Sequence, residues 1–200
     1  MANTSRLGRG FVPVRHLNGS PYNGQFNIYQ VGVSDGTALF IGDLVKASDE
    51  AATAVGTSWG TVERLAASGE DTSTVILGAV VGFVVDPTNL NWPQYRAAST
   101  LRYAMVADDP DLIFEVQDGA SVATPIASIG LNCGVQCTAG TAATGASNMT
   151  TGATAPTTTN TLPLRIMGMV NKPDNAYAAA YQKLLVRINL HAYHPSVAGV

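Results

Sequence analysis

Several residues in this sequence are of types that perform chemistry, and their spacing indicates which reaction they suit. The segment GVSDG, residues 32–36, matches the G-x-S-x-G elbow, in which a sharp turn from a strand into a helix exposes a nucleophilic serine. Three features oppose that role for Ser34. The residues that follow alternate like a strand, the chain lacks repeated strand–helix units, and Asp35-Gly36 is typical of a hairpin turn. We therefore expect Ser34 to lie in an ordinary turn, and we expect no catalytic residue.

Acidic residues are concentrated in VADDPDLIFEVQDG, residues 106–119, although only 12% of the chain is charged. They are Asp108, Asp109, Asp111, Glu115 and Asp118. Their spacing differs from the D-x-[DN]-x-[DN]-G pattern of a calcium loop. Asp109-Pro110-Asp111 lies between two strand patterns, where these residue types favour a hairpin turn, and Glu115 alternates with apolar neighbours, which directs it to the solvated face. We interpret the acids as turn and surface residues and expect no metal.

The histidines and cysteines are also poorly spaced for a metal centre. His191 and His194 form H-x-x-H, but residues three apart in a strand point to opposite faces, and His16 is far away in the sequence. Cys133 and Cys137 supply two ligands where a structural zinc site needs four. We expect small buried thiols without a disulfide, and no cofactor.

Four aromatic residues are candidates for stacking on a sugar or a nucleic-acid base: Trp59, Trp92, Tyr95 and Tyr103. The alternative is that they pack in the core or at a contact between subunits, where Trp and Tyr concentrate. Trp92 precedes Pro93 in an irregular segment, so we assign it to a contact surface.

The composition favours assembly with other proteins. Charged residues make up 12% of the chain, about half the usual share of roughly 25%, while the hydrophobic share is an ordinary 46%. A surface with so few charges is expected to be covered by copies of the chain or by a partner. The net charge of -3, without a basic run, opposes binding to nucleic acid or to an anionic membrane surface. The sequence contains neither an apolar secretion signal nor a membrane-spanning stretch, so we expect synthesis in the cytoplasm.

The elements that position these residues are mainly strands. Alternating or β-branched runs predict at least seven of them, for example FNIYQV at residues 26–31. Gly78 and Gly82 interrupt a β-branched run and predict bulges or sharp coiling in a buried strand. At most two short helices are expected, in ASVATPIASIG and around residues 174–181. The prediction is a mainly β sandwich or barrel, with a jelly-roll-like or smaller-barrel topology.

The β-rich domain is expected to span residues 25–200. Two segments differ from it in composition: one precedes the domain and the other lies within it. Residues 1–24 contain Gly, Pro and Asn among isolated apolar residues, which predicts an extended N-terminal arm that lies on a neighbour. Residues 138–161 have almost no large apolar side chain, which predicts either a long solvent-facing Thr/Gly-rich loop or a β-like excursion pinned by neighbours. The residues expected at an interface are Arg6, Phe11, Val12, Trp92 and Tyr95.

Several strings of the sequence resemble tailed-bacteriophage capsid decoration, or cement, proteins. They are GDLVKAS and VILGAVVGFVVDP, then VADDPDLIFEVQ, and finally LPLRIMGMVNKPDNAY leading into YQKLLVRINLHAYH. The resemblance spans residues 38–194 in separate blocks and involves structural strings without catalytic signatures. It implies a β-rich protein that binds the outer face of an assembled head, contacts several subunits of the major capsid protein and oligomerises at a local symmetry axis. By analogy with many decoration proteins, we expect a homotrimer first and a dimer second.

The expected function is therefore that of a structural virion protein, which stabilises the capsid lattice by bridging major capsid protein subunits. Linked contacts of this kind gain about 10² to 10⁴ in avidity over a single site. The alternatives are a tail or fibre component and a carbohydrate-binding module that uses Trp59 or Trp92. A small serine hydrolase that uses Ser34 is the most distant alternative.

Overall fold

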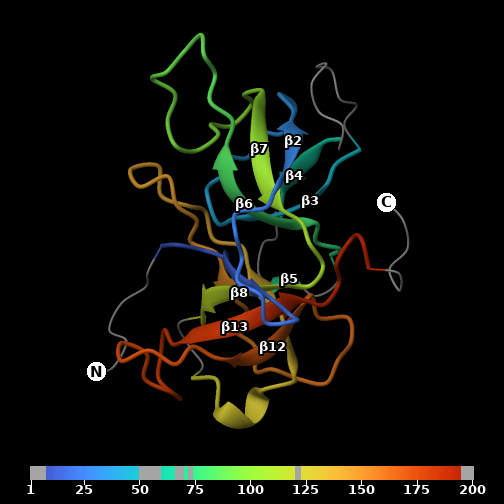
Figure 1. The fold of residues 1–200 in the computed structure, drawn as a ribbon, viewed down its shortest axis with the longest axis vertical. Helices are drawn as coiled ribbons and strands as arrows, with labels where there is room; N and C mark the ends of the chain where they lie inside the picture. Colours follow the sequence, from blue (N-terminus) through green and yellow to red (C-terminus); the bar gives the residue numbers. More distant parts are fainter. Residues whose placement is uncertain (1–7, 50–59, 66–69, 72–73, 120–122, 195–200) are drawn as a thin grey trace.

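The computed structural model describes residues 8–49, 60–65, 70–71, 74–119 and 123–194 (Figure 1). These residues form two five-stranded antiparallel sheets and one small three-stranded sheet, so the prediction of a mainly β protein is confirmed. The first sheet contains, in order, β1 (Val12–His16), β8 (Leu112–Gln117), β13 (Lys183–Ile188), β12 (Leu164–Met169) and β9 (Asn132–Cys133). The second contains β2 (Asn27–Val31), β7 (Arg102–Ala107), β6 (Gly78–Phe83), β3 (Leu44–Ala47) and β4 (Val62–Arg64). The small sheet contains β11 (Thr150–Thr151), β10 (Val135–Gln136) and β5 (Glu70–Asp71).

The second sheet curls towards a small barrel. Its outer strands β2 and β4 meet where Gln30 and Thr61 form a parallel bridge and the Gln30 amide donates to the Gly60 carbonyl at 3.1 Å. The apolar side chains enclosed by this sheet form one core cluster, with Tyr29, Val31, Leu39, Val45, Val62, Leu77, Val80, Ala104 and Val106. Curling of this kind reduces the exposed sheet edge, at which strands of other chains could otherwise pair.

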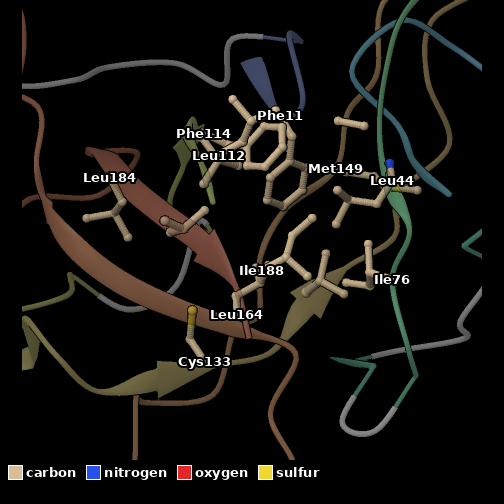
Figure 2. Close-up of a cluster of buried hydrophobic side chains, with 14 of the residues drawn as sticks. Phe11, Leu44, Ile76, Leu112, Phe114, Cys133, Met149, Leu164, Leu184 and Ile188 are labelled. Atoms are coloured by element: carbon tan, nitrogen blue, oxygen red, sulfur yellow. Dashed lines mark hydrogen bonds between the residues drawn. The ribbon is translucent and has the colours of Figure 1, made fainter. Parts of the chain in front are cut away.

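A larger core cluster lies on the first sheet (Figure 2) and reaches the second sheet through Leu44 of β3 and Ala79 of β6. Phe11 is 1% exposed in this cluster, and its ring meets Phe114 edge to face, with 6.5 Å between centroids. Burying an aromatic side chain of this size contributes about 1.5–3 kcal/mol. The prediction of an extended arm is therefore wrong from Phe11 onward, because Val12–His16 is a strand that pairs with β8. Pro13 concealed it, although proline is tolerated in an edge strand such as β1.

The turn at Asp109-Pro110-Asp111 forms as predicted, but it does not close a hairpin. The Asp111 amide donates to Asp109 Oδ1 at 2.8 Å, and the Leu112 amide donates to the Asp109 carbonyl at 3.1 Å. The strands on either side, β7 and β8, belong to different sheets. The turn is therefore a corner at which the chain passes from the second sheet to the first.

Gly82 lies at a bulge, as the sequence predicts, whereas Gly78 allows a close approach of two strands that the sequence did not predict. The pairing of β6 with β7 shifts register between Val80 and Gly82, as at a bulge. A Cβ atom on Gly78 would lie 2.3 Å from the Ala107 carbonyl oxygen, so only glycine allows the two strands to approach this closely.

The described residues of the two segments considered for helices form little helix. A 3₁₀ turn, η1 (Ile126–Ser128), follows Pro125, and no side-chain cap precedes it. Residues 174–181 form turns instead, because the buried Asn175 side chain donates to the Val170 and Lys183 carbonyls and accepts from the Lys183 amide. No helix in the described part of the chain is long and apolar enough to cross a membrane.

The Thr/Gly-rich segment, residues 138–161, takes the second of its two predicted forms, a β-like excursion pinned by neighbours. Thr150–Thr151 is strand β11, and an isolated bridge joins Ile41 to Ala146. Met149 is 1% exposed and packs in the larger core cluster (Figure 2). One large apolar side chain thus attaches a segment that is otherwise made of small residues.

Candidate functional site

The loop that joins β6 to β7 carries the two most exposed large hydrophobic side chains among the described residues. Leu90 is 77% exposed and Val85 is 67% exposed. Together with Phe83, Trp92 and Arg102 they line an open groove of about 330 Å³, and we call these five residues the ledge. Figure 1 shows this loop at one end of the long axis of the molecule. Neighbouring exposed apolar groups of this kind are typical of an interaction surface.

Arg102 holds the ledge together. Its guanidinium carbon lies 4.8 Å from the Phe83 ring centroid and 5.2 Å from the Trp92 ring centroid, within the range of cation–π attraction. The Nη1 atom also donates to the carbonyls of Pro93 and Tyr95, at 2.6 and 2.7 Å. Partial burial lowers the pKa of Arg102 while Asp86 opposes that shift, and the guanidinium remains charged near neutral pH. The aromatic rings are therefore held in place before any partner arrives.

Arg96 anchors the C-terminal part of the same loop. Its side chain is completely buried and donates to the carbonyls of Thr100, Thr37 and Gly32, at 2.7, 2.7 and 2.5 Å. Asp35 Oδ2 lies 3.2 Å from Arg96 Nη1 and supplies the compensating negative charge. Sequence reasoning missed this anchor, because an arginine in an irregular segment has no local signal that distinguishes it from a solvated one.

The GVSDG segment therefore belongs to the anchor of the ledge. Asp35 Oδ1 accepts a hydrogen bond from the Thr37 amide at 2.8 Å, while Ser34 is exposed on the preceding turn. The hairpin predicted at Asp35-Gly36 is wrong, because β2 pairs with β7 rather than with the next strand, β3. An irregular segment follows Gly36, so the strand-to-helix elbow of a serine hydrolase is absent at this position.

The residues predicted for an interface have separate locations. Trp92 belongs to the ledge, whereas the Tyr95 ring stacks on Phe40 with 5.0 Å between centroids. Phe11 is buried in the core, which corrects its assignment to an exposed contact, and Val12 is half-buried in β1. Arg6 and Trp59 lie outside the described residues. Tyr103 is half-buried in β7.

Three of the acidic candidates, and the histidine His16, lie at the turn between the two sheets. We call residues 108–111 and their side-chain partners the corner. Asp108 accepts hydrogen bonds from Asn27 Nδ2 at 2.9 and 3.0 Å and from the Tyr29 hydroxyl at 2.5 Å. Asp109 lies 3.0 Å from His16 Nδ1, and Asp111 accepts from Arg187 at 2.8 Å. Although His16 is remote in the sequence, the fold brings it to the acidic turn.

The other two acids of the cluster lie away from the corner. Glu115 is 15% exposed at its side chain and pairs with Lys172 Nζ at 2.8 Å, so it is not the fully solvated group that alternation predicted. Asp118 is buried and accepts hydrogen bonds from the hydroxyls of Thr124 and Thr151 and from the side-chain Nε2 of Gln182. The five acids therefore form no single site.

His191 is a buried histidine whose ring lies beside Tyr193, a member of the network that reaches Asp108. It is 1% exposed, its Nδ1 accepts from the Tyr193 amide at 3.1 Å, and its Nε2 has no hydrogen-bond partner among the described residues. Burial lowers the pKa of His191 to about 4, and the nearby charges of Asp108 and Asp109 oppose this shift. His194 is half-buried on the next turn. Within the described ranges, no three His, Cys, Asp or Glu residues are placed to hold a metal ion.

Sequence reasoning also missed a buried carboxylate, Asp43. It is fully buried, and it accepts from Arg64 Nε at 2.9 Å, from the Ser147 hydroxyl at 2.5 Å and from the Phe40 amide at 2.9 Å. Burial raises the pKa of Asp43, and Arg64 and the hydrogen bonds oppose that shift. The contact with Ser147 joins segments 104 residues apart in the sequence, which a local pattern does not reveal.

Cys133 is buried, as predicted for a small core thiol, whereas Cys137 is half-buried. In the described chain the two thiols form no disulfide.

No protein-family model, curated protein or solved structure matches this chain. At the corner, each acidic side chain of the turn has a partner from another segment, whereas the apolar side chains of the ledge are open to solvent. The ledge is the better candidate for a functional surface.

Proposed function

We propose that this protein is a structural virion protein, which binds the outer surface of a tailed-phage head and stabilises the capsid lattice by bridging subunits of the major capsid protein. One observation carries the proposal. The ledge lies at one end of the long axis, and η1 lies at the other end with Ile126 and Ile129 exposed at 57% and 45% (Figure 1). A protein that bridges two subunits needs two separated contact surfaces, and this chain offers two apolar ends.

The physical properties of the chain fit this role. The ledge is preorganised by Arg96 and Arg102, so little side-chain entropy is lost when a partner covers it. The low content of charged residues suits a surface that neighbours cover in an assembly. Modest contacts at both ends reinforce each other, because breaking one leaves the other to hold the chain in place. A tail or fibre position would use the same properties and is the nearest alternative.

Self-association belongs to the same proposal. A homotrimer at a local threefold axis is the first expectation and a dimer at a twofold axis is the second. Each copy would add its own ledge and η1 end to the lattice, which multiplies the linked contacts. The mass of the purified protein in solution, measured by analytical ultracentrifugation, distinguishes these states from a monomer.

A binding assay with expanded empty shells tests the bridging role. The full chain is sedimented with shells of the major capsid protein from the same virus, in three variants: Leu90→Ser at the ledge, Ile126→Ser at η1 and Leu17→Ser as a control. Leu17 is 45% exposed next to β1 and belongs to neither end. Loss of one buried leucine or isoleucine contact should weaken binding about tenfold or more, while the control should bind like the wild type. Absence of wild-type binding to shells would contradict the proposal.

A second candidate function is supported by the lining of the ledge groove. Besides Trp92 it contains the polar side chains of Asp86, Asn89 and Arg102, a combination of aromatic and hydrogen-bonding groups that also suits a sugar. A glycan array tests this directly. Hits with the wild type that disappear with Trp92→Ala would support carbohydrate binding, whereas an array without hits would exclude the sugars it displays.

A further inference from the structure

Two arginines face each other across neighbouring strands of the first sheet. Arg165 of β12 and Arg187 of β13 are direct partners in the antiparallel register, so both side chains leave the same face of the sheet. Like charges in directly opposite positions destabilise a strand pair. A negatively charged group between the two side chains would relieve this repulsion.

The two arginines also share a cavity. Arg165, Arg187, Asn160, Asn189 and His194 line an open hollow of about 380 Å³. The described residues that line it include no Phe, Tyr or Trp and no carboxylate, so it suits neither the stacking of a sugar ring nor the binding of a cation. Its polar lining is instead rich in N–H donors.

The hydrogen bonds of the arginines position both guanidinium groups without neutralising them. Arg165 Nε donates to Asn132 Oδ1 at 3.0 Å, and Arg165 forms no ion pair with any described residue. Arg187 Nε donates to the Pro110 carbonyl at 3.0 Å, and its Nη2 donates to Asp111 at 2.8 Å. Asp111 thus balances the charge of Arg187 alone, and the positive charge of Arg165 remains at the cavity.

We propose that this arginine pair is a binding site for an oxyanion, that is, a phosphate, sulfate or carboxylate group. Guanidinium groups recognise such groups with pairs of parallel hydrogen bonds, and here two of them converge on one hollow. The group belongs either to a small anion in solution or to an acidic side chain of a protein partner. The site is independent of the ledge and of the proposed function, because it lies on the other sheet.

Binding to the full chain is measured by NMR titration and thermal unfolding with two probes, inorganic phosphate and an acetylated hexaglutamate peptide. Sodium chloride at matched ionic strength controls for screening. We expect saturable shifts of the Arg165 and Arg187 side-chain signals with at least one probe, and a rise in Tm of roughly 2–4 °C near saturation. Phosphate binding alone indicates a small anion as the ligand, and peptide binding alone indicates a protein carboxylate.

Three variants make the result specific. Arg165→Gln should weaken binding about tenfold or more, and Arg165→Lys should have an intermediate effect because it keeps the charge but loses the paired hydrogen bonds. Lys46→Gln changes the net charge equally on the second sheet and should bind like the wild type. Equal binding by wild type and Arg165→Gln, equal effects of chloride and both probes, or no binding of either probe would overturn the proposal.

Discussion

The corner and the ledge use their side chains in opposite ways. At the corner, the residues that resemble a chemical site are bound to one another across the two sheets, so that Asp108, Tyr29 and Tyr193 form a connected network. At the ledge, the side chains of Leu90 and Val85 remain in solvent, and Arg102 stacks on the neighbouring Phe83 and Trp92 rings. The polar residues of the corner are used in joining the sheets, whereas the surface that the ledge offers to a partner is mainly apolar.

This difference shows why residue type alone is a poor guide to function in this chain. A buried carboxylate that receives several hydrogen bonds stabilises its surroundings, whether or not its sequence context resembles a site. An exposed leucine has no such use inside the molecule, and a groove of such residues indicates a partner. Substitutions at the corner should therefore change stability, while substitutions at the ledge should change binding.

The largest effect on stability is expected from Asp108→Ala. The change removes the acceptor for Asn27 and for the Tyr29 hydroxyl inside a buried network, which should cost about 3–4 kcal/mol of unfolding free energy. Burial and the hydrogen bond to Asp108 raise the pKa of Tyr29, so this hydroxyl stays protonated and donates. Urea unfolding followed by circular dichroism measures the loss.

Asp111→Ala is the matched control for this change, since it removes the same side chain from the same turn. The Asp111 side chain is 58% exposed and forms a surface pair with Arg187, so its loss should cost only about 0.2–1 kcal/mol. Equal losses in the two variants would show that the corner does not depend on the buried network.

The second prediction is that His191 makes the free energy of unfolding depend on pH. The pKa of His191 in the folded state, about 4, lies below the ordinary histidine value of 6.5, so the unfolded chain binds the proton more readily. The stabilisation is therefore complete above pH 6.5 and is lost as the pH falls towards 4, by about 3 kcal/mol in total.

His191→Asn isolates this contribution from the carboxylates that titrate in the same range. Asparagine keeps an acceptor for the Tyr193 amide, in the manner of an Asx turn, but does not ionise. Urea unfolding of both proteins at several pH values between 4 and 7 should give a difference that shrinks as the pH falls. A difference that is constant over this range would contradict the assignment of a buried neutral histidine.

The sequence predicts those features of the fold that depend on neighbouring residues, and it does not predict those that depend on residues far apart in the chain. Alternation predicted the mainly β class, and the two glycines of β6 predicted its bulge, because both depend on neighbouring residues. Asp109-Pro110-Asp111 predicted a turn for the same reason. Whether that turn joins strands of one sheet or of two depends on pairings with β1 and β13, which lie far away in the chain.

The candidate sites show the same limit. Trp92 was expected at a contact surface because of its irregular segment, and it does lie in the exposed groove. Arg102, which fixes the Trp92 ring, belongs to a strand, and Arg96 binds carbonyls about sixty residues away in the sequence. Phe11 was misplaced for a related reason, since its partner Phe114 lies across the sheet. Contacts between residues so far apart in the sequence can be identified only from the folded structure.

Among the changes at Asp108, His191 and Trp92, the smallest effect on stability is expected at the ledge, with Trp92→Ala. The substitution removes one cation–π contact of Arg102, while the bonds of Arg102 to the Pro93 and Tyr95 carbonyls and its contact with Phe83 remain. The cost should be about 0.5–1 kcal/mol in urea unfolding, well below that of Asp108→Ala. The same variant should lose binding to expanded shells, because a large aromatic surface at the groove has gone. A large loss of stability would instead make Trp92 a packing residue, and the contrast between the ledge and the corner would fail.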